Sequence, residues 1–371
     1  MAFCRSRALR AMPRAPAGKT AMKTQTIDVG LIGFGIAGRS FHAPIIHAVS
    51  GLRLAAIVQR SSSSAAEVYP DARIVRSIEE LLAIDTIRLV AIATPNDSHF
   101  PCAKQSLEAG RDVVVDKPFT TTLDEAKQLV ALAEKLGRLI TVYQDRRWDG
   151  DFQTVRQLLE SGELGRLVRF ESYYDRFRPN LRPGAWREKP GPGSGILFDL
   201  GPHLIDQALF LFGLPEFVEA DVRVERDACV TDDAFDILLH YPNGLRAALH
   251  ATMLAAAVRP HYVLLGTKGS FVKCALDPQE ALLRAGQSPG GPNWGVDPEE
   301  NWGTLTLSDG TTATKRVIPT ARGDYRGFYE NVRDAMLGRA SLAVTPPHAL
   351  NVMRVLELAR EGSRRKAAMP W

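Results

Sequence analysis

The chain has 371 residues, 45% of them hydrophobic and 24% charged, which is the composition of a globular protein long enough for two domains. No run of about 18 apolar residues occurs, so the sequence excludes a helix that spans a membrane. The net charge of +4 does not predict nucleic acid or an anionic membrane as a partner, because removing the six basic residues of positions 1–25, which include no acid, leaves −2.

Residues 1–25 form a basic leader without a continuous apolar segment, so they make a poor secretory signal. An Arg-rich, acid-poor leader is also compatible with a transit peptide. The lack of apolar periodicity favours a disordered segment, or an over-extended start ahead of Met22.

The four cysteines lie far apart and form no CxxC pair. This spacing predicts neither a zinc cage nor a disulfide framework, and the histidines are not clustered as metal ligands would be. We therefore expect no metal, and a reducing cytoplasm as the location.

From Ile27 onward, short apolar runs alternate with segments of helical periodicity. This alternation predicts parallel βαβ units and a doubly wound Rossmann sheet over residues 26–145. The expected strands are Ile27–Ile32, Arg53–Val58, Leu89–Ala93, Asp112–Val115 and Leu139–Tyr143, and the expected helices are Ile36–Val49, Ile78–Leu82, Phe100–Ala109 and Leu123–Leu136.

After about Arg146 the pattern changes to strands of alternating polarity, which predict an α+β domain over residues 146–371 with a large, mostly antiparallel sheet. The turn Pro242–Gly244 is a hairpin signal, Ser288–Asn301 reads as a loop, and the C-terminal helix is free to pack back on the Rossmann domain. The expected strands are Leu167–Arg176, Phe217–Val224, Phe235–Tyr241 and Leu245–Met253, and the expected helices are Asp151–Ser161, Ile196–Phe212 and Ala349–Glu361.

A GxGxxG motif, with Phe34 and Ile36 among its variable positions, follows the first predicted strand and opens a helix. In this context Gly33 makes the tight turn, Gly35 lets the backbone approach a pyrophosphate, and Gly38 permits close packing of helix on strand. The helix N-terminus faces the anion. The sequence therefore predicts a dinucleotide-binding site.

The end of the second predicted strand decides which dinucleotide fits best. NAD enzymes usually place an acid there, whereas this chain has Arg60, Ser61 and Ser62. An arginine pairs with a 2′-phosphate, and serines donate hydrogen bonds to it. The alternative is a solvated arginine in a serine-rich turn. NADP is favoured over NAD.

Three motifs carry a resemblance to the Gfo/Idh/MocA oxidoreductases: GFGIAG, ATPN at 93–96 and DKP at 116–118. Asp116 replaces the glutamate of that family's EKP motif. The segments SFHAP at 40–44 and QDRRW at 144–148 resemble NADP-linked members that include a scyllo-inositol dehydrogenase. The resemblance extends from Lys23 to the C-terminus.

Lys117 directly follows three valines that predict a buried parallel strand, and ligands of doubly wound sheets bind at the carboxyl ends of the strands. A solvated lysine is the alternative. The resemblance implies that Lys117 reaches the nicotinamide and the substrate oxygen, and it also points to a cis bond to Pro118.

The segment Asp199–His203 supplies the family's downstream Asp-x-x-x-His pattern. On a continuous helix Asp199 and His203 share one face, but Pro202 either kinks the helix or starts a new one. We expect His203 to be the catalytic base, with Asp199 orienting the substrate or the ring. The alternative is a core histidine bonded to Asp206.

The resemblance also implies further cofactor contacts from both domains, with Arg176 a weaker candidate for contact with the substrate. These predicted cofactor-binding residues are Thr94, Pro95, Asn96, His99, Lys117, Gln144, Trp186 and Arg187.

The resemblance implies a dehydrogenase that acts on a cyclic polyol or sugar. Two alternatives remain: a regulator that senses NADP or a sugar on the same scaffold, and a reductase similar to dihydrodiol dehydrogenase or biliverdin reductase. Apolar residues in Ala234–Leu239 and Ala247–Leu254 predict that a sheet face is covered. The resemblance implies that a second subunit covers it, in a homodimer or homotetramer.

Overall fold

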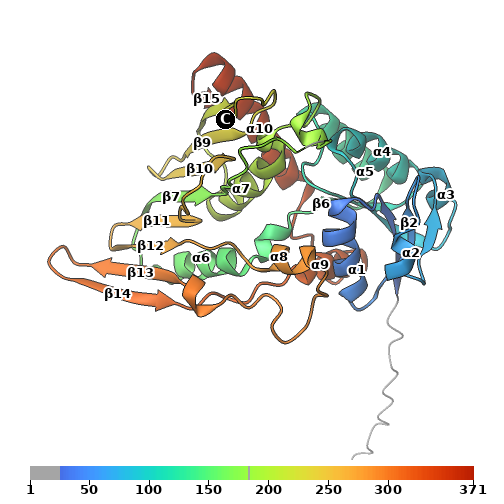
Figure 1. Ribbon diagram of the computed structural model, residues 1–371, viewed down its shortest axis with the longest axis horizontal. Helices are drawn as coiled ribbons and strands as arrows, with labels where there is room; N and C mark the ends of the chain where they lie inside the picture. Colours follow the sequence, from blue (N-terminus) through green and yellow to red (C-terminus); the bar gives the residue numbers. More distant parts are fainter. Residues whose placement is uncertain (1–25, 183) are drawn as a thin grey trace, which may run out of the picture.

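Six parallel strands form the sheet predicted for the N-terminal domain (Figure 1). This computed structural model describes residues 26–182 and 184–371, so the predicted disordered leader lies outside the described residues. The strand order is β3-β2-β1-β4-β5-β6, and it reverses between β1 and β4 as in a Rossmann fold. The strands are β1 (Ile27–Ile32), β2 (Leu52–Val58), β3 (Arg73–Val75), β4 (Ile87–Ile92), β5 (Asp112–Val115) and β6 (Ile140–Val142).

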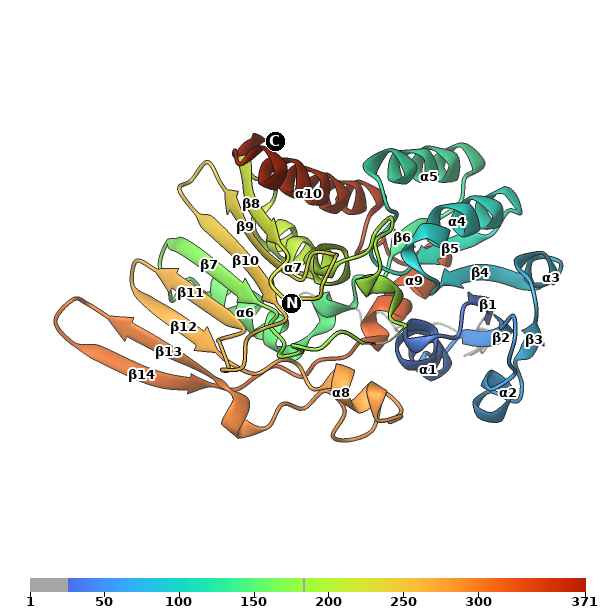
Figure 2. The same ribbon diagram turned by 45° about the horizontal axis from the view of Figure 1, so that its top comes forward.

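Helices cover both faces of this sheet, with α4 and α5 on one side and α1 on the other (Figure 2). The predicted helix Ile36–Val49 begins as a six-residue π-helix and continues as α1. In α5, a capping box between Thr122 and Glu125 fixes the start, and Gly137 ends the helix with φ 62°. The helices are η1 (Ala37–His42), α1 (Ala43–Ala48), α2 (Ala65–Val68), α3 (Ile78–Leu82), η2 (Asn96–Ser98), α4 (His99–Glu108) and α5 (Leu123–Leu136).

The second domain is built on a nine-stranded sheet of order β14-β13-β12-β11-β7-β10-β9-β8-β15. Only the β7–β10 pair is parallel, so the predicted α+β class is confirmed. The turn between β9 and β10 contains Gly244 at φ 83°, as the hairpin signal predicts. The strands are β7 (Leu167–Tyr173), β8 (Phe217–Arg223), β9 (Ala234–His240), β10 (Arg246–Thr252), β11 (Tyr262–Gly266), β12 (Gly269–Lys273), β13 (Gly303–Ser308), β14 (Ala313–Ile318) and β15 (Met369–Pro370).

The strands β11 to β14 were not predicted from the sequence. The β14 strand is exposed along almost its whole length, so no apolar face marks it. The β11 and β12 strands are only five residues long and carry glycine at one end. Short or exposed strands give weak alternation, because alternation reports a buried face.

A layer of helices separates the two sheets: α6 (Gly150–Ser161), α7 (Ile196–Phe212) and α10 (Pro346–Arg365) (Figure 2). The α7 helix is continuous, with Pro202 inside it, so of the two alternatives at this position a new helix start is wrong. Asp199 and His203 therefore lie one turn apart on the same face. No helix within the described ranges is long and apolar enough to cross a bilayer.

The chain returns to the Rossmann domain near its C-terminus. In α9 (Arg326–Met336), the Tyr329 hydroxyl is 2.7 Å from Nδ1 of His42. The Thr141 hydroxyl of β6 donates to the Val344 carbonyl at 2.7 Å, and α10 packs against α5. Residues 146–371 are thus not a separate body, because their last helices help to enclose the first sheet. The remaining helices are η3 (Asp145–Trp148), η4 (Trp186–Glu188), α8 (Gln279–Arg284) and η5 (Glu299–Asn301).

Candidate active site

The glycine-rich turn after β1 leaves open space above its backbone. Gly33 has φ 96°, and a Cβ there would lie 2.6 Å from the Ala93 carbonyl oxygen. A Cβ at Gly38 would lie 2.1 Å from the Gly33 oxygen, whereas Gly35 has no atom within 4 Å of that position. Gly33 and Gly38 are thus required for packing, and the space at Gly35 fits a dinucleotide pyrophosphate. The intervening side chains, which keep partial or full exposure, are Phe34 and Ile36.

The loop after β2 is held in shape by an arginine from outside it. Arg76 donates to the carbonyl oxygens of Gln59 at 2.8 Å and Ser62 at 2.5 Å. Arg60 and Ser61 are exposed at the surface of this loop, and positions 59–64 carry no carboxylate. The loop therefore offers an arginine and hydroxyl groups, and no negative charge that would repel a 2′-phosphate.

The segment after β4 links the two domains. The Asn96 side chain is buried and donates from Nδ2 to the Gly193 carbonyl at 2.7 Å. The neighbouring Thr94 hydroxyl is buried without a hydrogen-bond partner among the described residues. Pro95 begins the short η2 helix. This segment holds the loop before α7 against the carboxyl edge of the parallel sheet.

His99 lies where its ring cannot reach a ligand. The side chain is fully buried. Its Nδ1 is 2.8 Å from the Pro118 carbonyl oxygen, and its Nε2 is 3.1 Å from the Thr94 carbonyl oxygen. His99 thus ties the turn after β4 to the turn after β5. We interpret it as a structural support of the cofactor site rather than a contact residue.

Lys117 follows β5 at the centre of this edge. Its peptide bond to Pro118 is cis, as the resemblance implies. The carboxylate of Asp116 accepts a hydrogen bond from the Lys117 amide at 2.9 Å and lies 3.6 Å from Nε2 of His42. Burial raises the pKa of Asp116, but the His42 ring and Lys117 outweigh burial, so the pKa stays below its usual value. Asp116 therefore supplies a fixed negative charge directly behind Lys117.

Three cations surround the Asp199 carboxylate. Lys117 Nζ and Arg187 Nε lie 3.3 and 3.1 Å from Oδ1, and Arg176 Nη1 lies 3.4 Å from Oδ2. Burial raises the pKa of Asp199, but the three cations together hold the pKa well below its usual range. Lys117 Nζ also donates to the Asp199 carbonyl oxygen at 2.5 Å. Asp199 thus anchors Lys117, in addition to the role expected for it in orienting the substrate or the His203 ring.

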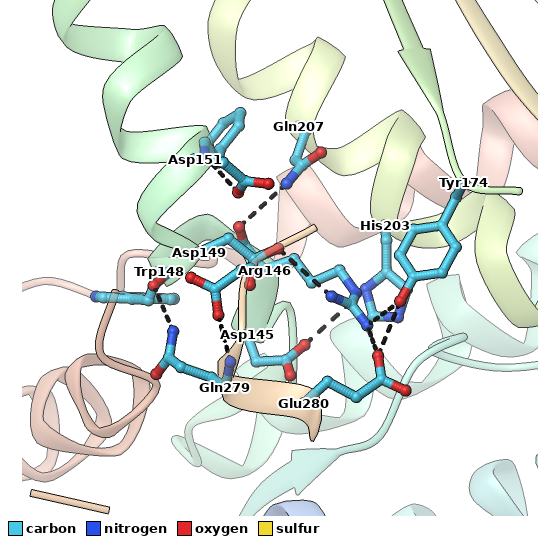
Figure 3. A network of polar contacts seen from close by, with 12 residues as sticks. Asp145, Arg146, Trp148, Asp149, Asp151, Tyr174, His203, Gln207, Gln279 and Glu280 are labelled. Atoms are coloured by element: carbon cyan, nitrogen blue, oxygen red, sulfur yellow. Dashed lines mark hydrogen bonds and ion pairs between the residues drawn. The ribbon is translucent and has the colours of Figure 1, made fainter. Parts of the chain in front are cut away.

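His203 lies one helical turn further along α7. Its side chain is 6% exposed, and its Nδ1 has no hydrogen-bond partner among the described residues. The nearest carboxylate is Asp145, with Oδ1 at 3.9 Å (Figure 3). Burial, followed by the charges of Lys117 and Arg146, lowers the pKa of His203 well below its usual value. The imidazole is therefore neutral near pH 7, as a general base must be.

The alternative in which Asp206 binds His203 is wrong. Both Asp206 oxygens accept from the Arg147 guanidinium at 2.7 Å, and His348 Nε2 lies 3.1 Å from Oδ1. This buried group connects η3, α7 and α10. Asp206 is therefore structural, and His203 remains available for a ligand.

Beneath His203, a layer of buried polar groups surrounds Arg146 (Figure 3). The guanidinium donates to the Tyr174 hydroxyl at 2.8 Å, lies 3.4 Å from Asp149 Oδ2, and pairs with Glu280. These groups come from η3, the end of β7 and α8. The layer fixes the floor of the site where the two domains meet.

Two further predicted cofactor residues, Gln144 and Trp186, come from different domains. Gln144 follows β6 and is buried, and its Oε1 has no hydrogen-bond partner among the described residues. Trp186 is partly buried in η4, with the Arg187 guanidinium 4.5 Å from its ring centroid. Gln144 thus presents an unpaired amide oxygen from the first domain, and the Trp186–Arg187 pair approaches from the second.

No metal site competes with this interpretation in the part of the chain that the structure describes. Those residues contain no group of three or more His, Cys, Asp or Glu side chains placed to hold an ion. The described cysteines, Cys102, Cys229 and Cys274, are free.

Comparison with known proteins identifies the family. Residues 27–144 match the oxidoreductase family with an NAD-binding Rossmann fold, and residues 152–272 match the GFO/IDH/MocA C-terminal domain. The chain belongs to the Gfo/Idh/MocA family. This membership makes it an NAD(P)-binding oxidoreductase.

Several family members match over nearly their whole length. YdgJ of Escherichia coli, named as an uncharacterized oxidoreductase, is 43% identical over 93% of this chain and 99% of its own. IolW of Bacillus subtilis, named scyllo-inositol 2-dehydrogenase (NADP(+)), is 36% identical over 93% and 96%. The solved structure of the oxidoreductase YvaA from Bacillus subtilis has a TM-score of 0.90 at 36% identity, covering 94% of this chain and 99% of that one.

Asp145 and Tyr174 are the site residues that sequence reasoning missed, and Arg176 is more central than predicted. Asp145 is part of the quoted QDRRW segment, directly after a predicted buried strand. An acid at the carboxyl end of a parallel strand is a signal that could have identified it. Tyr174 carries no such signal, because its position depends on how the second domain folds over the first.

Proposed function

We propose that the protein is an NADP-dependent oxidoreductase that interconverts a secondary alcohol and a ketone on a cyclic polyol or sugar. The observation that carries the proposal is the convergence of Lys117 and His203, from different domains, beside one carboxyl edge of the sheet. The open backbone at Gly35 supports binding of the dinucleotide at the same edge.

The roles of the two residues follow from their surroundings. When bound, the nicotinamide accepts or supplies a hydride. Lys117, anchored by Asp199, places a positive charge where the substrate oxygen gains negative charge during alcohol oxidation. His203 Nε2 then takes the hydroxyl proton, because Nδ1 faces Asp145 and the ring is neutral. In reduction the same nitrogen returns the proton.

The substrate class is supported by relatives and by the polar character of the site. IolW is named for activity on scyllo-inositol with NADP(+), and two 33% identical relatives from Corynebacterium glutamicum, which match over 39% of this chain, are named inositol 2-dehydrogenases. A screen of cyclic polyols and aldoses with NADP+, followed by absorbance of the reduced nicotinamide, tests the proposal. Absence of turnover on every compound with both NADP+ and NAD+ would reject it.

We propose that the protein prefers NADP because of the residues in the loop that follows β2. Replacing Arg60 by Ala should raise the apparent constant for NADP+ by roughly ten- to a hundredfold, since a hydrogen bond to a charged group is worth about 1.5–3 kcal/mol. The constant for NAD+ should change little, because NAD+ lacks the 2′-phosphate. Arg138→Ala, which alters another surface arginine, serves as the control. Equal effects of Arg60→Ala on both nucleotides would contradict this assignment.

Self-association is proposed from the face of the large sheet that α7 and α10 leave uncovered. Phe217, Leu265 and Val317 lie on this face and are 44%, 37% and 58% exposed. These side chains stand on three separate strands, and together with the family resemblance they support pairing of this face with a second copy of the chain. Light scattering at micromolar concentration should give a dimer or tetramer, and a monomeric mass would refute the proposal.

A further inference from the structure

The described residues around Lys117 carry more positive than negative charge. Asp199 is the shared counterion of Lys117, Arg176 and Arg187, each of whose side chains is no more than 31% exposed. Asp199 is thus shared by three cations, and of these only Lys117 has a second carboxylate, Asp116, beside it. Groups held partly out of water are costly unless their charges are balanced, so this excess calls for an additional anion.

Arg178 adds a fourth cation, because it is two residues from Arg176 on an extended segment bridged at Phe177 to Leu254, and alternate side chains of such a segment lie on the same side. Its guanidinium is partly buried and has no acceptor among the described residues, although its backbone is fixed by a 2.7 Å hydrogen bond to the Met253 carbonyl. Burial, followed by the positive charges of Arg176, Arg182 and Arg284, lowers the pKa of Arg178. An arginine that repels its neighbours and lacks a partner has its donors free for a ligand.

The acids nearby are already committed to other cations. Glu280 pairs with both Arg146 and Arg284. Glu188 lies 3.5 Å from Arg182 and 3.4 Å from Arg226. Within the described ranges, no other carboxylate is paired with Arg176, Arg178 or Arg187.

Arg176 and Arg187 each contact Asp199 through one nitrogen, and their other guanidinium nitrogens make no hydrogen bond to a described residue. Arg187 Nε lies within ion-pair distance of Asp199, yet it is buried and makes no hydrogen bond to any described residue. The Arg176 guanidinium lies 5.3 Å from the Tyr174 ring centroid and reaches Asp199 only at 3.4 Å. Planar guanidinium groups with free donors match the oxygens of a carboxylate or phosphate.

Among these arginines only Arg187 is a predicted cofactor contact, so the cofactor does not account for the charges of Arg176 and Arg178. The oxidised nicotinamide ring is itself a cation, so placing it beside Lys117 increases the repulsion. The pyrophosphate and 2′-phosphate fit the turn at Gly35 and the loop at Arg60, which belong to β1 and β2 rather than to the second domain.

We infer that the substrate is a polyhydroxylated anion, whose carboxylate or phosphate binds Arg176 and Arg178 while its reacting hydroxyl lies between Lys117 and His203. This inference rests on the proposed function and narrows its substrate class from polyols and sugars in general to sugar acids or sugar and polyol phosphates.

The test compares matched pairs of compounds with the full-length protein and NADP+. Glucuronate against glucose and gluconate against glucitol test a carboxylate, and myo-inositol 1-phosphate against myo-inositol tests a phosphate. For at least one pair, kcat/KM should be ten- to a hundredfold higher for the anion, the range expected when a charge-assisted hydrogen bond is gained. Calorimetry of the NADPH-loaded protein with the same compounds should show the same order of affinity.

Arg178→Gln should reduce the preference for the anion by about tenfold, while the dissociation constant for NADPH stays unchanged. Arg156→Gln, which alters an arginine paired with Glu160 on α6, should leave the preference as in the wild type. The anion subsite is wrong if the neutral compounds are turned over or bound as well as their anionic counterparts. It is also wrong if Arg178→Gln lowers kcat/KM equally for the neutral and the anionic compound. In either case the oxidoreductase proposal stands. Absence of turnover together with anion binding that depends on Arg178 would instead reject only the reaction.

Discussion

In the first half of α7, Asp199 is surrounded by more cations than it can neutralise, and His203 has an unbonded ring nitrogen. In the second half, Asp206 is paired through both oxygens with Arg147, and Gln207 bonds the Arg146 carbonyl and the Tyr262 hydroxyl. Both halves bury polar groups on one otherwise apolar helix. Pairing within the protein indicates a structural role, whereas missing partners indicate a place for a ligand.

The largest effect is expected from replacing His203 in the first half of α7, or Lys117, which Asp199 anchors. Lys117→Met and His203→Ala should each lower turnover by about 10²–10⁴-fold, the usual contribution of a positioned acid or base. Thermal unfolding and NADPH affinity should stay close to those of the wild type, because neither side chain supports the core. Near-normal turnover of both variants on the true substrate would show that these residues are not catalytic.

The next effect is expected from replacing Asp206, the paired acid in the second half of α7. Asp206→Ala leaves Arg147 without its carboxylate, and breaking a buried ion pair of this kind costs about 3–5 kcal/mol. The urea midpoint should fall sharply, while turnover per folded molecule changes little. Asp199→Ala is the matched comparison on the same helix, and it should lose turnover with a smaller change in midpoint. Equal midpoints for Asp206→Ala and the wild type would remove the distinction between the two halves.

How much of the structure could be predicted from the sequence depends on whether a feature has a local signal. The strands of the Rossmann sheet were located within two residues where the chain is buried on both faces, as in β1 and β5, because continuous apolar runs are local signals. The hydrophobic helix α7 was also bounded correctly, although the sequence left open whether the helix kinks or restarts at Pro202. Motif residues such as Lys117 and His203 were identifiable because their family pattern is local too.

What could not be predicted depends on contacts between distant segments. Arg146, Tyr174 and Glu280 form one network although they are separated by up to 134 residues. The return of α9 and α10 onto the first domain likewise has no local signature. The carboxylate that lies near His203 belongs to Asp145 and not to Asp199. This follows from the position of η3 against α7, which residue spacing along the helix does not reveal.

The smallest effect is expected from replacing Asp145. Its buried carboxylate affects both the rate of oxidation and the stability of the fold, so one substitution tests both effects. Burial raises the pKa of Asp145 to about 6, so the carboxylate is ionised at pH 7 and can stabilise the imidazolium that His203 forms during oxidation. Asp145→Asn should lower the oxidation rate at pH 8 by about tenfold, or about 1.4 kcal/mol. Below pH 6 the rates of variant and wild type should converge, because the wild-type carboxyl is then protonated.

Stability should change in the opposite direction. The folded pKa of about 6 lies above the usual 3.8, so ionising Asp145 costs folding free energy that appears as the pH rises from 4 and is complete above 6. Asp145→Asn removes this cost, and its urea midpoint should exceed that of the wild type at pH 7 but match it at pH 3.5. Asp85→Asn, an exposed carboxylate, should shift neither quantity. A slower enzyme that is also less stable at pH 7 would mean that Asp145 supports the fold rather than the charge on His203.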